Sequence, residues 1–175
     1  FTYMPKLLAE WPRFRNVPCT SSQLARVTDH LIELIRGQSI FAYSRPKAEG
    51  HFDPRAHFGV APHQRLIVAT MSSNDEYTAG IRVGAQKPWS RLLFDSQIDW
   101  IKALTEFAKR RSDVFLVIRV HPREFPNRRE GRKSQHACHL ESALQGLPSN
   151  AVVNWPGENI SIYDLIDKTD LFLNA

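Results

Sequence analysis

The sequence predicts an α/β protein: a Rossmann-like, three-layer domain with a parallel sheet, preceded by an irregular N-terminal arm with one helix. Three observations lead to this prediction. From residue 65 onward, short apolar runs alternate with amphipathic helical stretches. Before residue 65, Pro and aromatic residues interrupt every pattern but one. The chain has 175 residues, 42% of them hydrophobic and 23% charged, which suits one folded core and excludes two full-sized ones.

Residues 1–64 form the predicted arm and linker. One stretch of it, at about residues 22–36, places apolar side chains on a single face at helical spacing. Ser22 can cap the N-terminus of this helix, and Gly37 can end it. The segment 39–43 is a candidate short strand, and the remainder of the arm is expected to be loop.

Residues 65–175 form the predicted Rossmann-like domain. Its first two apolar runs have the length and composition of buried strands, and two further short runs are predicted as the third and fourth strands. The helix after the first strand has a continuous apolar face, and Asp95 or Ser96 can cap it. The predicted elements in chain order are strand 65–71, polar loop 72–80, helix 94–112, strand 113–120, helix 134–147, strand 150–155, helix 161–169 and strand 170–175.

The carboxyl ends of these strands are the expected place for a ligand. In open parallel sheets, ligands bind in the crevice outside the carboxyl ends of the strands. The segments that follow the strands are Ser72–Glu76, His121–Glu124 and Trp155–Asn159, with Asn174 at the end of the fourth strand. We therefore expect these four segments to share one edge of the sheet.

The charge of the chain indicates what kind of partner it can bind, and its two cysteines indicate the redox conditions in which it works. The net charge is +5, and the segment Arg119–Lys133 alone holds six basic residues against two acidic ones. This basic loop is either a solvated surface or a binding site for an anion, such as a phosphate or an anionic membrane surface. It carries no nucleic-acid recognition motif, so no nucleic acid partner is expected. Cys19 and Cys138 form no CxxC pair, which favours a reducing cytoplasm, and no metal site is predicted.

The pair His121–Pro122 is the most informative motif. Pro fixes its own φ and keeps the preceding residue extended, so an imidazole at the tip of a buried strand is held toward the crevice. Arg119 and Arg123 flank it, and this set suits a phosphate or pyrophosphate. Arg119 and His121 point to the same side if the strand extends through both. The alternative is a strand-end His that only hydrogen-bonds the backbone.

Two further segments hold candidate site residues. Ser72, Ser73 and Asn74 can bind phosphate or hydroxyl groups, and Asp75 or Glu76 can act as a base. The alternative is a polar loop that caps the next helix.

After the third strand, Glu158, Asn159 and Ser161 are candidates for nucleotide binding. The alternative is that Asn159 or Ser161 is simply the N-cap of the next helix, with Asp164 completing a capping box if the cap is Ser161.

The motifs TMSSNDEYTAG, FDSQIDWIKAL, FLVIRVHPRE and NAVVNWPGENISIYDLIDKTDLFLNA together resemble the bacterial capsule polysaccharide biosynthesis proteins. These are glycosyltransferases of the GT-B class, with two Rossmann-like domains. The resemblance covers roughly residues 65–175 and implies the C-terminal, donor-binding half of such an enzyme. It implies that His121 binds the donor phosphate and stabilises the leaving nucleotide, without a metal or other cofactor.

The same resemblance implies the reaction and the partners. The donor is a nucleotide-sugar, with CMP-Kdo as a candidate, and the acceptor is a polysaccharide or a lipid-linked sugar. The protein would work in the cytoplasm, at the inner face of the membrane. Sialyltransferases of the GT-B class have a similar His-Pro motif, and their catalytic base belongs to the other domain. This argues against Asp75 or Glu76 as the base in this chain. A glycerophosphotransferase, a nucleotide-sugar epimerase and a non-catalytic anion-binding module are the alternatives. Family members continue past the fourth strand, so we expect the domain to be truncated at its C-terminal end.

Overall fold

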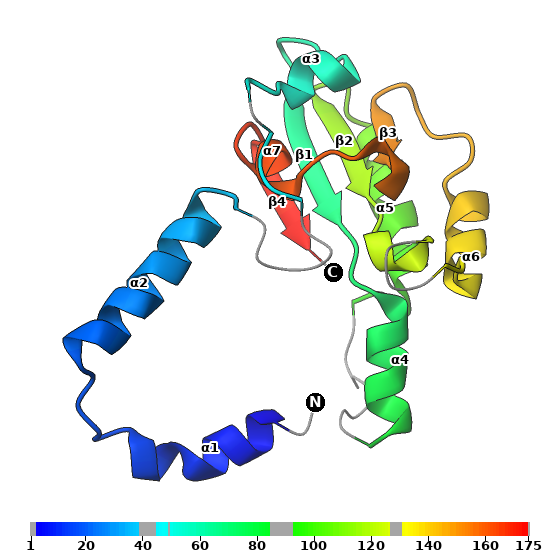
Figure 1. The fold of residues 1–175 in the computed structure, drawn as a ribbon. Helices are drawn as coiled ribbons and strands as arrows, with labels where there is room; N and C mark the ends of the chain where they lie inside the picture. Colours follow the sequence, from blue (N-terminus) through cyan, green and yellow to red (C-terminus); the bar gives the residue numbers. More distant parts are fainter. Residues whose placement is uncertain (1–2, 39–44, 49, 85–92, 127–130, 175) are drawn as a thin grey trace.

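The computed structural model describes residues 3–38, 45–48, 50–84, 93–126 and 131–174 (Figure 1). The predicted strand at 39–43 and the basic residues Arg128 and Arg129 lie outside the described residues.

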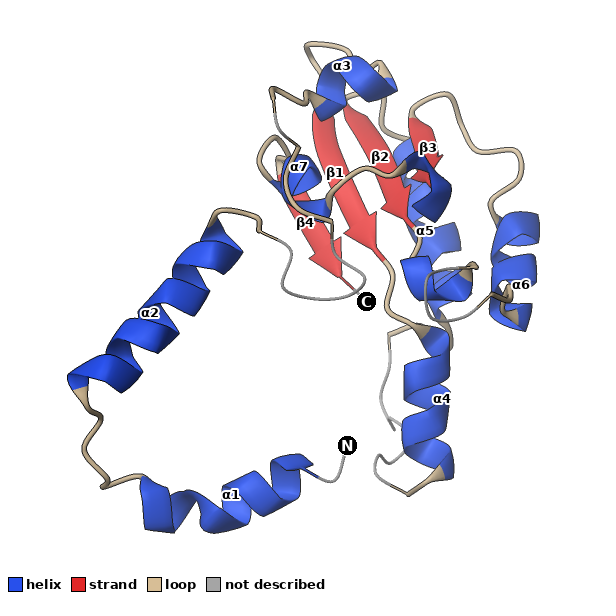
Figure 2. Ribbon diagram, in the orientation of Figure 1, coloured by secondary structure: helices blue, strands red, loops and turns tan. Residues whose placement is uncertain are grey.

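A four-stranded, all-parallel sheet forms the centre of the fold, as predicted (Figure 2). The strands are β1 (Arg65–Thr70), β2 (Val114–Arg119), β3 (Ala151–Asn154) and β4 (Leu171–Asn174), in the spatial order β3-β2-β1-β4. The register places Thr70 beside Arg119 on one side and beside Asn174 on the other. The last residues of β1, β2 and β4 therefore lie next to one another at the carboxyl edge.

Alternation along the strands divides the buried side chains between two faces of the sheet. One face of β1 and β2 packs against α5 (Gln97–Lys109) and α6 (Gln135–Ala143), with Ile101 and Leu140 in this cluster. The other face packs against α7 (Ile162–Ile166) and the segment around α3 (Pro54–Phe58). Helices on both faces of a parallel sheet give the three layers of a Rossmann-like domain.

The segment after β1 differs from its prediction. A polar loop was expected at 72–80, but α4 (Asn74–Arg82) begins four residues after the strand ends. Polar residues in its first turn, Asp75 and Glu76, suit the positive end of a helix dipole. The low hydrophobicity of this segment hid a helix that lies largely at the surface.

The other predicted helices of the domain are confirmed with shorter bounds. Ser96 is the N-cap of α5 and accepts a hydrogen bond from the N–H of Asp99. Ser134 caps α6 in the same way, through the N–H of Ala137. Two short 3-10 turns, η1 (Pro122–Glu124) and η2 (Pro156–Glu158), follow β2 and β3.

The first 64 residues hold more helix than predicted. Besides the expected helix, which is α2 (Ser21–Ile35), the structure contains α1 (Tyr3–Phe14) and α3. The N-cap of α2 is Thr20, not Ser22, because Thr20 and Gln23 form a reciprocal capping box. Gly37 follows the helix with a φ of 70°, as its predicted terminator. In Figure 1, α1 and α2 lie apart from the sheet.

The division at residue 64 does not coincide with a packing boundary. Phe52, Phe58 and Val60 pack against the α7 face of the sheet, although they precede β1. The N–H of Ala48 also donates to both carboxylate oxygens of Asp164 on α7. By contrast, α2 buries no residue, and the apolar side chain of Ile35 is 85% exposed. Within the described ranges, none of the helices is both long and apolar enough to cross a membrane.

Candidate functional site

The strand order creates a topological switch point at the carboxyl edge. From β1 the chain crosses to β2 and β3 on one side, and then returns to place β4 on the other side of β1. Connections leave neighbouring strands in opposite directions at such a point and open a crevice between them. Here the crevice lies where β1 and β4 end, and the hydroxyl of Thr70 donates to the side-chain oxygen of Asn174 across it at 2.8 Å.

A cavity of about 270 Å³ occupies this position. It lies at the carboxyl ends of β1, β2 and β4, and Ile162 at the start of α7 forms part of its wall. Arg119 and His121 both line it, so the structure brings the two leading candidates to one hollow. Its lining consists of Thr70, Met71, Arg119, Val120, His121, Pro122, Ile162, Phe172 and Asn174.

His121 is held by its own turn. β2 ends at Arg119, and His121 is the extended N-cap residue of η1, with φ −65° and ψ 129°. The condition that the strand extends through both residues is therefore not met, yet both reach the same cavity. Nδ1 of His121 accepts a hydrogen bond from the N–H of Arg123 at 3.2 Å. A neutral imidazole that accepts at Nδ1 carries its proton on Nε2.

Burial determines the charge state of His121. It lowers the pKa of the imidazole, and the nearby Glu76, Glu124 and Asp75 only partly offset this effect. At pH 7 the ring is therefore neutral, and Nε2–H is a hydrogen-bond donor. The hydrogen bond at Nδ1 also agrees with the alternative in which His121 only hydrogen-bonds the backbone. The backbone contact uses Nδ1, and a contact with a ligand would use Nε2.

Arg119 ends β2 and is part of a short polar chain along the edge. One of its terminal nitrogens donates to the side-chain oxygen of Asn154, the last residue of β3, at 2.5 Å. The amide nitrogen of Asn154 in turn donates to Glu158 at 2.9 Å. Burial lowers the pKa of Arg119, and Glu158 acts in the opposite direction. The guanidinium is thus a cation oriented by Asn154 at the wall of the cavity.

Arg123, Asp75 and Glu76 pair with one another. Nε of Arg123 lies 2.9 Å from the carboxylate of Asp75, and a terminal nitrogen lies 2.6 Å from that of Glu76. None of the three lines the cavity. The predicted phosphate ligand and the two predicted bases are therefore joined in an ion-pair cluster that attaches the η1 turn to α4.

The serine-rich segment after β1 lies outside the cavity lining. Ser73 is buried, occupies the N-cap position of α4 and donates to the carboxylate of Asp75. The N–H of Asn74 donates to Glu124 at 2.8 Å, and the carbonyl of Ser72 accepts from Gln97 at 3.2 Å. The segment thus leads directly into α4 and is not the polar loop that the sequence predicted.

The candidates after β3 have local partners as well. Ser161 is the N-cap of α7, accepts from the N–H of Tyr163 and donates to the carbonyl of Arg45. The capping box with Asp164 is not formed, because Asp164 accepts from Ala48 instead. Asn159 takes a left-handed conformation, with φ 61°, at the end of η2. Glu158 accepts from the N–H of Trp155 and from Asn154.

Several residues in and around the cavity were not among the sequence candidates. Thr70, Asn154 and Phe172 lie within strands, whereas most of the predicted candidates follow a strand. Thr70 and Asn154 are the final residues of their strands, a position that could have pointed to them. Glu124 fell within the predicted segment His121–Glu124 without a role of its own, and it is 2% exposed although the basic residues around it suggested a solvated loop.

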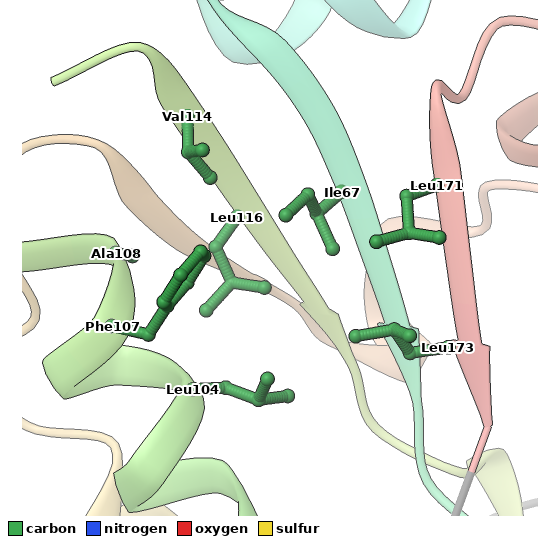
Figure 3. A pocket seen from close by; sticks show the side chains of 8 residues that line it. All are labelled: Ile67, Leu104, Phe107, Ala108, Val114, Leu116, Leu171 and Leu173. Atoms are coloured by element: carbon green, nitrogen blue, oxygen red, sulfur yellow. The ribbon is translucent and has the colours of Figure 1, made fainter. Parts of the chain in front are cut away.

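A second hollow, of about 250 Å³, lies on the opposite face of the sheet. Figure 3 shows aliphatic side chains from β1, β2 and β4 facing Leu104 and Phe107 of α5 across it. Its lining is entirely apolar and contains no group that could bind a charged ligand. The described residues also contain no group of three His, Cys, Asp or Glu side chains arranged to hold a metal ion.

Comparisons with protein-family models, with curated proteins and with solved structures find no match for this chain. The fold and the geometry of the edge cavity are therefore the basis for a function.

Proposed function

We propose that this chain is the donor-binding part of a glycosyltransferase of capsule or surface polysaccharide synthesis. It would bind a nucleotide-sugar, with a CMP-linked sugar such as CMP-Kdo as the first candidate, for transfer to a polysaccharide or lipid-linked acceptor. The observation that carries the proposal is the cavity at the switch point, where Arg119 and His121 meet. Nucleotides bind at this position in doubly wound sheets. The proposal that a sugar is transferred rests on the resemblance of residues 65–175 to the capsule polysaccharide biosynthesis proteins.

Sugar transfer from a nucleotide requires positive charge and hydrogen-bond donors beside the phosphate of the leaving nucleotide. The bond between the anomeric carbon and the phosphate oxygen breaks, the acceptor oxygen bonds to that carbon, and negative charge grows on the phosphate. Arg119 supplies a fixed cation, and Nε2–H of the neutral His121 supplies a donor. Groups already oriented in this way stabilise a developing anion without reorganising during the reaction.

We do not assign the base that accepts the acceptor's proton to this chain. Asp75 and Glu76 are engaged by Arg123 and lie outside the cavity. Three of the described basic residues of the segment Arg119–Lys133 have partners within the chain: Arg119 bonds Asn154, Arg123 pairs with two carboxylates and Lys133 pairs with Glu141.

Isothermal calorimetry with CMP, UDP, CDP and CMP-Kdo tests the proposal on wild type, His121→Ala and His63→Ala. His63 is exposed and lies just before β1, at the amino edge, so it is a matched control. We expect wild type and His63→Ala to bind at least one nucleotide equally, and His121→Ala to bind it at least tenfold more weakly, about 1.4 kcal/mol.

Binding of none of the four by the folded protein would contradict the proposal. Equal affinities of wild type and His121→Ala would also contradict it. Salt-dependent binding of any DNA duplex, with no nucleotide bound, would instead indicate the anion-binding module.

A further inference from the structure

Glu124 is an unusually buried carboxylate next to the candidate site. It is 2% exposed, and it ends the turn His121–Glu124. Glu is almost never buried to this extent unless its charge is matched by hydrogen-bond donors. Such burial, in a segment with six basic residues and only two acidic ones, indicates that the carboxylate of Glu124 has a specific structural role.

The carboxylate of Glu124 connects two helix starts. One oxygen accepts from the N–H of Asn74, the first residue of α4, at 2.8 Å. The other accepts from the hydroxyl of Ser134, the N-cap of α6. The N–H of Ser134 also donates to the carbonyl of Glu124 at 2.9 Å. Negative charge is favourable at both ends, because the N-terminus of a helix carries partial positive charge.

The neighbouring residue strengthens the same attachment from outside. Arg123 pairs with Asp75 and Glu76 in the first turn of α4, while Glu124 bonds the N–H of Asn74 from within. Two consecutive residues of the turn thus hold one helix start. The inner contact is shielded from solvent, whereas the carboxylates of the outer pair are about half exposed, so the inner contact is the stronger constraint.

The position of His121 depends on this attachment. The N–H of Glu124 donates to the carbonyl of His121 at 3.1 Å, and the N–H of Arg123 donates to its Nδ1. The turn is therefore one hydrogen-bonded unit, with the imidazole at one end and the buried carboxylate at the other. A shift of the carboxylate would move the ring with it.

We propose that Glu124 is a positioning residue that holds the His121 turn against α4 and α6 and so fixes the imidazole at the cavity where an anionic ligand binds. The role for the ligand rests on the proposed nucleotide binding. Glu124 acts through His121 because it does not line the cavity and both of its oxygens accept from protein donors. It would orient the imidazole without touching the nucleotide.

The test compares Glu124→Ala, Glu124→Gln and the control Glu141→Gln, a half-buried glutamate of α6 that pairs with Lys133. Two quantities are measured: the calorimetric affinity for CMP, and the nitrogen NMR shifts of the His121 ring in the ligand-free protein. We expect Glu124→Ala to weaken CMP binding at least tenfold and to change the ring shifts. Glu124→Gln keeps one acceptor oxygen and should lie between wild type and Glu124→Ala. Glu141→Gln should match wild type.

The two readouts separate this proposal from the proposed function. If wild type binds no nucleotide, the function fails, and the NMR shifts alone decide the role of Glu124. Folded Glu124→Ala with wild-type ring shifts overturns the positioning role, as does wild-type CMP affinity.

If Glu124→Ala does not fold, the His121 ring shifts of Glu124→Gln and Ser134→Ala test the positioning role of Glu124 instead. Ser96→Ala is the control for loss of a helix cap, because Ser96 caps α5 and has no contact with Glu124 among the described hydrogen bonds. Ring shifts that change in Ser134→Ala but not in Ser96→Ala support the proposal. Ring shifts unchanged in both Ser134→Ala and Glu124→Gln overturn it.

Discussion

Two hollows of similar size lie on opposite faces of one sheet, at about 250 and 270 Å³. The same edge strand, β4, contributes to both: Leu171 and Leu173 line the apolar hollow beside α5, and Phe172 and Asn174 line the cavity at the carboxyl edge. Alternation of side chains along a strand is enough to give one strand two different surfaces. Volume does not distinguish the hollows, so their chemistry must.

The difference comes from where each hollow lies along the strands. The apolar hollow lies along one face of β1, β2 and β4, before the carboxyl ends of the strands, and the strand side chains that line it are aliphatic. The polar cavity lies where the strands end and where Arg119, His121 and Asn174 follow. We therefore expect substitutions beside the first hollow to change stability and those at the second to change binding.

Leu116→Ala gives the largest expected effect. Leu116 is 1% exposed and lines the apolar hollow. Its truncation should lower the free energy of unfolding by about 2–5 kcal/mol, measured by urea titration, because it removes buried area and leaves a void. Nucleotide affinity of the folded protein should stay within twofold of wild type. A tenfold loss of affinity would show that the two hollows are not independent.

Asp170→Ala tests how β4, the strand that lines both hollows, is attached at its beginning. Asp170 accepts from the N–H of the fully buried Leu66 at 2.8 Å and pairs with Arg55 and Arg65. Its loss leaves that N–H without its charged acceptor, at a cost of about 1–3 kcal/mol in urea unfolding. The control Asp167→Ala removes only an exposed pair with Lys47 and should cost much less.

The effect of Asp170→Ala should also depend on pH. The Leu66 N–H holds the pKa of Asp170 below its usual 3.8, so its stabilisation is present above that value and is lost as the pH falls through the lower folded pKa. The difference between wild type and variant should shrink on acidification below pH 4. A difference that stays constant there would argue against the charged contact.

Thr70→Val changes the polar cavity with little change of shape. The Thr70 hydroxyl donates to Asn174 and to the carbonyl of Leu173. We expect a loss of about 0.5–1.5 kcal/mol in unfolding free energy, together with weaker nucleotide binding in calorimetry. If stability falls and binding does not, the switch point between β1 and β4 takes no part in recognition.

The smallest expected effect is the acid dependence that His121 confers. Burial lowers its folded pKa below 6.5, so the unfolded chain binds more protons below that pH and stability falls as the pH falls. His121→Ala should make the thermal midpoint less sensitive to pH between 7 and 5. Equal slopes in wild type and His121→Ala would contradict a partly buried, neutral imidazole.

The sequence was most informative where local pattern and burial agree. All four strands were found because each is a short apolar run, although only β1 and β2 are buried along nearly their whole length, while most of β4 is exposed. Helix α4 was missed because its surface position leaves a polar sequence with no apolar face, and α1 was missed because Pro5 and Pro12 break the usual helical pattern. The Thr20 cap was missed by two residues because several hydroxyl residues are adjacent.

The candidate site was predicted less completely than the fold. His121 and Arg119 line the cavity, whereas Ser72, Ser73 and Asn74 lie outside its lining, at and just before the start of α4. Arg123 was expected to bind phosphate, and in the structure it pairs with the carboxylates of Asp75 and Glu76, 48 and 47 residues earlier in the chain.

The sequence by itself determined the strands, the parallel α/β class and the stiff His121–Pro122 turn, because these follow from the conformations that each residue allows and from alternation along short segments. Tertiary structure decided which polar groups meet. It placed Glu124 within reach of Asn74, 50 residues away, and left Arg119 and His121 in one cavity with Thr70 and Asn174. The partners of a charged group depend on contacts between distant segments, and these contacts exist only once the sheet has brought its strand ends together.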